Sequence, residues 1–306
     1  MTERQRPLRI GVQLPEVERV VRWPELRDMA QAAEEIGFDS LWVGDHLLYH
    51  SADETTGPWE AWSMLAALAA STNRIEIGPL VAATSFHSPA MLAKKAATVH
   101  EVSAGRLILG LGAGWNATEY RAFGFPFDHR ATRFEEAFTI IRSLLDGQEV
   151  NFEGSYYRIE ACVLEPASAH GAPPLMIGSN GPRVLRMTLP YVDMWNTWHA
   201  WYGNDLPGLR QMLQGVDGAC EAVGRPSDEV AKTAAVMIGL EGGTGRHHGS
   251  PGRPTSEAIS EPPEQLAMRL RSYAAAGVSH VQLVLDPITL ESIAEVGNVL
   301  DILDAD

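Results

Sequence analysis

A carboxylate and an imidazole stand side by side at the end of one apolar run of the sequence. The run Ser40-Leu-Trp-Val-Gly44 predicts a β-strand, and Asp45 and His46 follow it directly. Histidine titrates near neutral pH, so His46 has the chemistry to exchange a proton with a cofactor or substrate. A hydrogen-bonded pair that only caps the strand is the competing interpretation, and the dipeptide alone favours it.

Three glycines alternate with other residues where another predicted strand ends. Gly110, Gly112 and Gly114 allow a planar ligand to approach the main chain closely. They do not form a dinucleotide-binding fingerprint, because Trp115 occupies the third glycine position of GxGxxG and no helix is predicted to begin there.

A glycine-rich turn leads from a later strand into a helix. Gly181 and Pro182 suit the first positions of that helix. Its free main-chain amides, with Ser179 and Arg183 nearby, predict a phosphate site. An ordinary capped helix start is the alternative.

Large aromatic residues follow one another closely after the next strand: Trp195, Trp198, Trp201 and Tyr202. An aromatic wall for an apolar or ring-bearing substrate is the functional interpretation. Core packing explains Trp195 equally well, but not the whole run, which continues beyond the predicted end of the strand.

Metal and hydrolase chemistry find little support in the sequence. No His-x-His follows the first strand, and His46 and His50 form an isolated pair outside any predicted helix, so no metal site is predicted. The second carboxylate of a glycosidase pair is missing, because the fourth strand ends in glycine and alanine. No GxSxG nucleophile motif occurs.

The elements that must position these residues alternate between short apolar runs and longer segments of helical period, which is typical of βα units. Leu26, Met29 and Ala33 begin one such helical period after the first strand. Eight strands, each followed by a helix, predict a closed (β/α)8 TIM barrel formed by residues 1–306 as a single domain. The predicted strands are Arg9–Leu14, Ser40–Gly44, Ile75–Val81, Arg106–Leu111, Leu175–Gly178, Val192–Asn196, Val230–Leu240 and His280–Leu285.

Three long insertions interrupt this pattern, and we expect them at the carboxyl-terminal face of the barrel, where active sites lie. They fall near residues 115–130, 147–171 and 242–263. The second insertion predicts a hairpin that turns at Glu153-Gly-Ser155. The third is rich in Gly, Pro and Ser, which predicts a mobile lid. After the first, Thr132 and Glu135 have the spacing of a capping box for the next helix.

Composition excludes several classes of partner and location. The chain has 306 residues, of which 45% are hydrophobic and 21% charged, as in globular enzymes. A net charge of −15 argues against nucleic-acid binding and against an anionic membrane surface. Two cysteines without a metal-ligand spacing, no long apolar run and no signal-peptide core favour the cytoplasm.

Five motifs in this order and spacing resemble the luciferase-like monooxygenase superfamily, especially its branch that uses the deazaflavin coenzyme F420. The resemblance covers residues 8–303, nearly the whole chain. The motifs are Gly11-Val-Gln-Leu-Pro15, Gly37-Phe-Asp-Ser-Leu-Trp-Val-Gly-Asp-His46, Ala70-Ser-Thr-Asn-Arg-Ile75, Gly112-Ala-Gly-Trp115 with Glu119-Tyr120, and Ile177-Gly-Ser-Asn-Gly-Pro-Arg183.

The resemblance implies a TIM barrel that holds a flavin or deazaflavin at its mouth, with Asp45 and His46 as the catalytic candidates near the reactive ring. It also implies a non-proline cis peptide at Leu80-Val81, behind the ring. The implied cofactor contacts are Leu80, Val81, Ala82, Gly112, Ala113, Asn116, Gly178, Ser179, Asn180, Gly181, Pro182 and Arg183. The candidate substrate contacts are Trp115, Trp195, Trp198 and His50.

One departure from the family pattern bears on the substrate. Hexose-phosphate dehydrogenases of the F420 branch have a catalytic Glu directly after the strand-four glycines, where this chain has Trp115. The departure argues against sugar-phosphate oxidation and favours an apolar or aromatic substrate.

Three hypotheses follow. The first is an F420-dependent oxidoreductase that transfers a hydride to or from a small organic substrate. The second is a two-component monooxygenase that uses reduced FMN and oxygen. Either enzyme would receive reduced cofactor from a separate flavin or F420 reductase. The third is a noncatalytic ligand-binding barrel, which retention of the Asp45-His46 pair argues against. The apolar outer faces of barrel helices permit a homodimer, and the sequence leaves the oligomeric state open.

Overall fold

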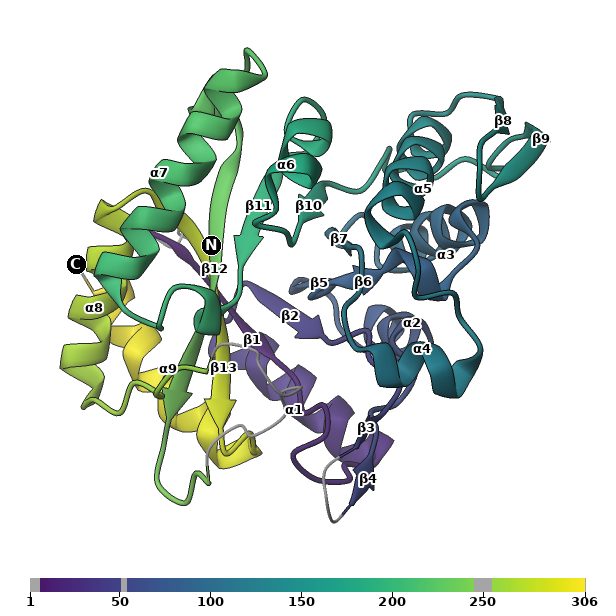
Figure 1. Ribbon diagram of the computed structural model, residues 1–306. Helices are drawn as coiled ribbons and strands as arrows, with labels where there is room; N and C mark the ends of the chain where they lie inside the picture. The colour runs from purple at the N-terminus through teal and green to yellow at the C-terminus, as the bar shows by residue number, and fades with distance from the viewer. Residues whose placement is uncertain (1–5, 51–53, 245–254, 306) are drawn as a thin grey trace.

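The computed structural model describes residues 6–50, 54–244 and 255–305. Within them, nine parallel strand segments form one sheet that closes on itself almost completely, with helices around its outside (Figure 1). In their order around the sheet, the segments are β5 (Glu76–Pro79), β2 (Ser40–Val43), β1 (Arg9–Gln13), β13 (Val278–Asp286), β12 (Ala231–Gly239), β11 (Met194–Thr197), β10 (Leu175–Ile177), β7 (Leu109–Gly112) and β6 (Ala82–Ala83).

Two of these segments are halves of one barrel strand. β5 pairs with β2 on one side of the sheet, and β6 pairs with β7 on the other. The chain between the halves contains a cis peptide bond between Leu80 and Val81, as expected from the family resemblance. A parallel bridge from Ile77 to Leu107 draws the two sides together. The described strands therefore fill the eight positions of the predicted (β/α)8 barrel.

In the described part of the chain, each of the eight strand positions leads to a helix outside the sheet. The apolar period predicted after the first strand faces the core, because Leu26, Met29 and Ala33 are buried. The eight helices are α1 (Trp23–Ile36), α2 (Ala61–Ser71), α3 (Pro89–Val102), α5 (Arg130–Leu145), α6 (Pro182–Thr188), α7 (Leu206–Ala222), α8 (Pro263–Ala275) and α9 (Leu290–Asp304).

The insertions carry structure of their own. Helix α4 (Ala117–Phe123) lies in the first insertion, and the hairpin of β8 (Val150–Glu153) and β9 (Arg158–Cys162) lies in the second, which confirms the predicted turn. Most of the third insertion, residues 245–254, lies outside the described residues, so the lid stays a prediction. After it, Ile259 forms a parallel bridge with Ile238 of β12. A further short hairpin, β3 (Tyr49–His50) with β4 (Thr55–Thr56), was not predicted.

The predicted capping box is wrong. Helix α5 begins at Arg130, and its N-cap residue is His129, in the left-handed region with a φ of 50°. Thr132 and Glu135 therefore lie inside the helix. Because the helix begins before Thr132, both side chains are available for contacts with residues outside the helix.

A chain of hydrogen bonds runs through the interior of the barrel beside apolar side chains. Trp42, which is fully buried, packs with Ile108 and Met176. Its indole nitrogen donates to the hydroxyl of Ser40 over 2.7 Å, and that hydroxyl lies 2.7 Å from Nε2 of His280. Burial lowers the pKa of His280 to about 3, helped by the nearby charge of Arg9, so this imidazole is neutral.

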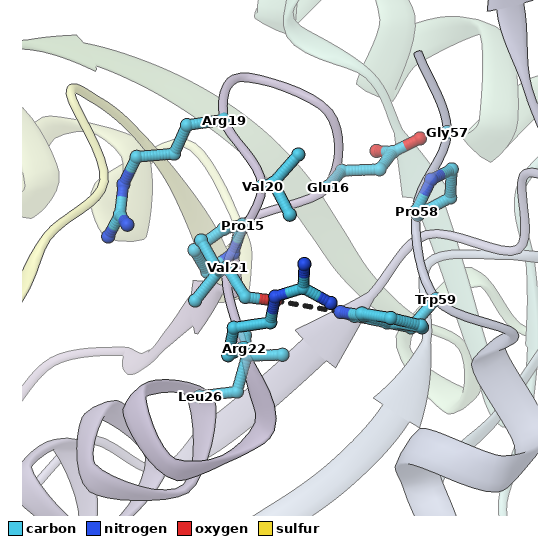
Figure 2. A pocket seen from close by; sticks show the side chains of 10 residues that line it. All are labelled: Pro15, Glu16, Arg19, Val20, Val21, Arg22, Leu26, Gly57, Pro58 and Trp59. Atoms are coloured by element: carbon cyan, nitrogen blue, oxygen red, sulfur yellow. Dashed lines mark hydrogen bonds between the residues drawn. The ribbon is translucent and has the colours of Figure 1, made fainter.

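A pocket of about 170 Å³ opens between the segment after β1 and the segment before α2 (Figure 2). We call it the Trp59 pocket, since the indole of Trp59 forms one wall. Glu16, Val20, Arg22, Leu26 and Pro58 are among its other lining residues. In the described helices, no stretch is both long and apolar enough to cross a membrane.

Candidate active site

Asp45 follows the end of β2, and its carboxylate fastens that end to the next barrel strand. Only 3% of the residue is exposed. Its Oδ2 accepts a hydrogen bond of 2.8 Å from the main-chain nitrogen of Ala83 in β6, and lies 3.1 Å from Nε2 of His87. These contacts join Asp45 to Ala83 and His87 rather than to His46, and a catalytic role for Asp45 stays a prediction.

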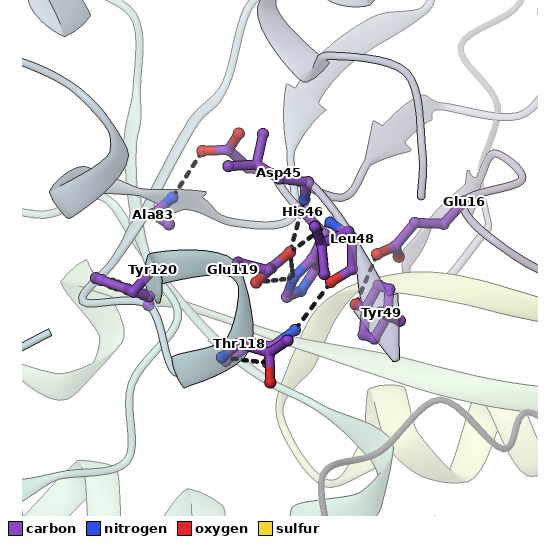
Figure 3. Close-up of polar contacts among 12 residues, drawn as sticks. Glu16, Asp45, His46, Leu48, Tyr49, Ala83, Thr118, Glu119 and Tyr120 are labelled. Carbon is purple, nitrogen blue, oxygen red and sulfur yellow. Dashed lines mark hydrogen bonds and ion pairs between the residues drawn. The ribbon is translucent and has the colours of Figure 1, made fainter. Parts of the chain in front are cut away.

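His46 has a carboxylate partner that lies far along the chain. Its Nδ1 lies 3.1 Å from both carboxylate oxygens of Glu119 (Figure 3). An ionised carboxylate only accepts hydrogen bonds, so this contact places a hydrogen on Nδ1. Nε2 is then the nitrogen with which His46 can exchange a proton.

Glu119 is held rigidly enough to orient an imidazole. The residue is fully buried. Its Oε1 accepts a 2.6 Å hydrogen bond from the main-chain nitrogen of Leu47, and a longer one of 3.3 Å from that of Leu48. The carboxylate therefore fixes the main chain that follows His46 as well as the imidazole itself.

Several carboxylates surround His46. Burial lowers its pKa, but the charges of Glu16, Glu119 and Asp45, with the hydrogen bond from Glu119, outweigh burial and raise the pKa above 6.5. At neutral pH a larger fraction of this imidazole is protonated than of a free histidine. His46 is therefore suited to donate a proton and to take it back.

Two aromatic rings flank the imidazole. The ring centroids of Tyr49 and Trp115 lie 4.9 and 5.4 Å from that of His46. The hydroxyl of Tyr49 donates to Oε1 of Glu16 over 2.8 Å (Figure 3). Trp115, a predicted substrate contact, thus lies beside His46.

Helix α4 brings Glu119 to His46, and Asn116 starts that helix. The Asn116 side chain accepts a hydrogen bond from the main-chain nitrogen of Thr118 and donates one of 3.1 Å to the carbonyl of Leu48. Asn116 is 3% exposed. The structure gives this predicted cofactor contact a local role, which is to join the start of α4 to the segment after His46.

Val81 fills the space beside the glycines at the ends of two neighbouring strands. A Cβ added to Gly112 or Gly178 would lie 2.8 Å from a methyl carbon of Val81, and one added to Gly110 would meet the carbonyl oxygen of Pro79 at 2.3 Å. The sequence-based interpretation assigned this space to a planar ligand. The structure shows that these glycines admit Val81 at the break between β5 and β6, and the approach of a planar ligand stays a prediction.

The turn after β10 leads through Gly178, Ser179 and Asn180 into α6. The Ser179 hydroxyl accepts a hydrogen bond from the main-chain nitrogen of Gly181. Asn180 donates to the hydroxyl of Thr197 over 3.4 Å, but its Oδ1 is buried and has no hydrogen-bond partner within the described residues. A buried amide oxygen of this kind normally has a donor, so a ligand at this turn would satisfy it.

Arg183, predicted to contact a phosphate, is engaged elsewhere. Its guanidinium forms two hydrogen bonds, of 2.6 and 2.7 Å, with the carboxylate of Glu135 and a third with the hydroxyl of Thr132, both in α5. A neighbouring carboxylate therefore balances its charge in this structure. Moreover, α6 has only seven residues, which weakens the argument for a phosphate site at its start.

The other predicted substrate contacts are dispersed. Trp195 is fully buried in the main core, and its indole nitrogen donates to the carbonyl of Ser179 over 2.9 Å, so the interpretation as core packing is correct for this residue. His50 is exposed and bonded to the hydroxyl of Thr55, so the structure does not bring it to His46. Trp198 is half-buried, with its ring centroid 4.5 Å from that of His199.

Sequence reasoning assigned no role to Glu119 or Glu16. Glu119 was only part of a family motif, and Glu16 follows the first strand without any local signal. For Glu119 the local signal was available: Asn116 is a favourable N-cap residue, so a short helix after it would place Glu119 one turn inside.

Comparisons with known proteins give the family and the fold of the chain. Residues 8–240 match the model of the family described as luciferase-like monooxygenase. The chain belongs to that family. Its fold is also that of a solved F420-dependent secondary alcohol dehydrogenase in complex with an F420-acetone adduct, with a TM-score of 0.80 over 97% of this chain and 99% of that one, at 18% identity.

Two curated relatives are a reductase and a dehydrogenase. The 5,10-methylenetetrahydromethanopterin reductase of Archaeoglobus fulgidus is 33% identical over 173 residues, which are 56% of this chain and 48% of that protein. The F420-dependent glucose-6-phosphate dehydrogenase of Amycolatopsis mediterranei is 36% identical over 170 residues, 53% of this chain and 49% of that protein. The match thus spans about half the length of each relative.

Proposed function

We propose that this protein is an oxidoreductase that transfers a hydride between coenzyme F420 and a small organic substrate. The observation that carries the proposal is the buried carboxylate of Glu119 on Nδ1 of His46, which leaves Nε2 to exchange a proton. The F420-dependent relative of Amycolatopsis mediterranei and the fold shared with an F420-dependent alcohol dehydrogenase support the choice of cofactor.

The residues present fit a deazaflavin at the carboxyl ends of the strands. The partnerless Oδ1 of Asn180 would accept a hydrogen bond from the bound cofactor. Ala113, which follows β7, is small and only partly buried and would leave room for the ring, and the main chain of Ser179 and Gly181 would hold the cofactor tail.

The protein's own part in the reaction is proton management and exclusion of water. A bound deazaflavin supplies or accepts the hydride. When an alcohol is oxidised, Nε2 of His46 takes the hydroxyl proton, and in the reduction of a carbonyl it returns that proton. Glu119 stabilises the imidazolium that forms. The raised pKa of His46 allows this imidazole both to accept and to donate a proton near neutral pH.

The rings beside His46 suggest the substrate class. Trp115 and Tyr49 present aromatic surface beside the imidazole with which the substrate would exchange a proton. Trp115 also stands where F420-dependent hexose-phosphate dehydrogenases have a catalytic Glu. We therefore propose an apolar or ring-bearing alcohol or carbonyl compound rather than a sugar phosphate.

A second candidate is an FMNH2-dependent monooxygenase, which the description of the matching family favours. Both candidates would depend on a separate flavin or F420 reductase for reduced cofactor. A homodimer belongs to the proposal as well, and sedimentation velocity at several protein concentrations would test it.

Titration of the purified protein with F420 and, separately, with FMN decides between the candidates, with ligand fluorescence as the signal. Preferential binding of F420 supports the proposal. Preferential binding of FMN supports the monooxygenase, and binding of neither supports a barrel that has lost the family chemistry. With F420 bound, turnover of a series of aromatic and aliphatic alcohols would then test the proposed substrate class.

A further inference from the structure

The Trp59 pocket holds an exposed tryptophan whose orientation is fixed. The exposed fraction of Trp59 is 49%, although its indole nitrogen donates a 2.7 Å hydrogen bond to the carbonyl of Val21 (Figure 2). This bond anchors the edge of the ring and leaves apolar ring surface facing the pocket. Such surface suits a planar, apolar partner.

Arg22 supplies a positive charge beside that ring. Its Cζ lies 5.7 Å from the centroid of the Trp59 ring. Within the described residues, the Arg22 guanidinium has no ion pair and no hydrogen bond. Arg19, another cation of the pocket, is engaged with Glu25. Arg22 is therefore the cation that is available to a bound anion.

The size of the pocket limits the ligand to about one ring. Its volume is about 170 Å³. A cavity of about 150 Å³ lined by apolar side chains is large enough to admit benzene. Val20, Val21, Leu26 and Pro58 contribute apolar lining on the remaining sides.

From these three observations we propose that the Trp59 pocket binds a single-ring aromatic carboxylate, with the ring against Trp59 and the carboxylate on Arg22. Glu16 also lines the pocket. Its negative charge orients the ligand, because the carboxylate must point away from Glu16 and toward Arg22.

This site adjoins the proposed reaction centre, because Glu16 lines the pocket and its charge also raises the pKa of His46. Glu16 bonds to the hydroxyl of Tyr49, and the ring of Tyr49 lies between that bond and His46. A ligand in the pocket would thus contact Glu16 on one side while the imidazole lies beyond Tyr49. Binding there does not require the cofactor, so this proposal stands or falls independently of the proposed function.

Isothermal titration of the purified protein, without cofactor, with benzoate, benzyl alcohol and acetate tests the proposal. Benzyl alcohol keeps the ring without the charge, and acetate keeps the charge without the ring. We expect benzoate to bind at least about tenfold more tightly than either, because it alone engages both Trp59 and Arg22.

Variants then locate the site. Arg22→Ala and Trp59→Leu should each weaken benzoate binding about tenfold or more. Arg27→Ala is the matched control, since it removes an equal charge from the same helix region at a residue paired with Asp28, outside the pocket. It should leave binding unchanged, as should His46→Asn. Absence of benzoate binding, or binding that survives both Arg22→Ala and Trp59→Leu, would overturn the proposal.

Discussion

Glu119 and His46, separated by 73 positions in the chain, meet through a carboxylate and Nδ1 at 3.1 Å. The carboxylate also accepts hydrogen bonds from the main-chain nitrogens of the two residues that follow the histidine. One side chain on helix α4 therefore sets the tautomer of His46, the plane of its ring and the path of the chain beyond it. The pair has the geometry by which a carboxylate orients a histidine that transfers protons.

Replacement of His46 tests whether this imidazole takes part in the reaction. His46→Asn should retain affinity for the cofactor and lose turnover by about 10² to 10⁴-fold, which is the range attributed to a positioned general acid or base. Fluorescence titration would measure the affinity for the cofactor. A steady-state assay with the cofactor bound would measure turnover. Unchanged turnover would remove His46 from the mechanism.

Replacement of Glu119 tests its role as a positioning residue. Glu119→Gln keeps an oxygen for the main chain of Leu47 but removes the charge, so the pKa of His46 should fall, and turnover should drop by up to about 10²-fold. NMR titration of the His46 ring protons would measure the pKa, a property that a purely structural role would leave unchanged.

The sign of the linked stability change follows from the raised pKa of His46. A raised pKa in the folded state means that the protonated ring adds stability below the unfolded pKa and that this stability is lost as the pH rises through the folded pKa. Glu119→Gln should reduce this dependence. The exposed Glu264→Gln should preserve both the titration and the rate, and a His46 pKa unaltered by Glu119→Gln would contradict the assignment.

The barrel could be predicted from the sequence because the apolar periods of strands and helices can be recognised without knowledge of tertiary contacts. The site depended on contacts that no local pattern encodes. Whether Trp195 lined a wall or filled the core was decided by the packing around it, and the charge of Arg183 was balanced by Glu135 from another helix. The cis bond at Leu80-Val81 was expected only through the family resemblance.

The contact of Gly178 with Val81 gives a test of packing at the broken strand. A Cβ at position 178 would lie 2.8 and 2.9 Å from the two methyl carbons of Val81, which are attached to a short, branched side chain that cannot move aside. Gly178→Ala should therefore lower the free energy of unfolding by about 1–3 kcal/mol, measured by urea denaturation.

The double variant separates this collision from any other effect of alanine. In Gly178→Ala with Val81→Ala, the nearest contact of the new Cβ becomes the Val81 Cβ at 3.5 Å, an ordinary van der Waals distance. The double variant should therefore be more stable than the sum of the two single losses predicts. Strict additivity would mean that Val81 is not what position 178 accommodates.

The buried His280 predicts how stability depends on acid. Its folded pKa is about 3 because burial disfavours the charged ring, whereas in the unfolded chain a histidine titrates near 6.5. Between these values the unfolded state binds a proton that the folded state does not, so the free energy of unfolding falls as the pH drops below 6.5. At pH 4.5 the loss from this group should be about 3 kcal/mol.

Urea denaturation of the wild-type protein and of His280→Asn from pH 7 to 4.5 would isolate this loss of stability, with the exposed His170→Asn as the matched control. The difference in stability between wild type and His280→Asn should shrink steadily with acid, whereas His170→Asn should follow the wild type. Parallel curves for wild type and His280→Asn would show that the folded barrel does not lower the pKa of this ring.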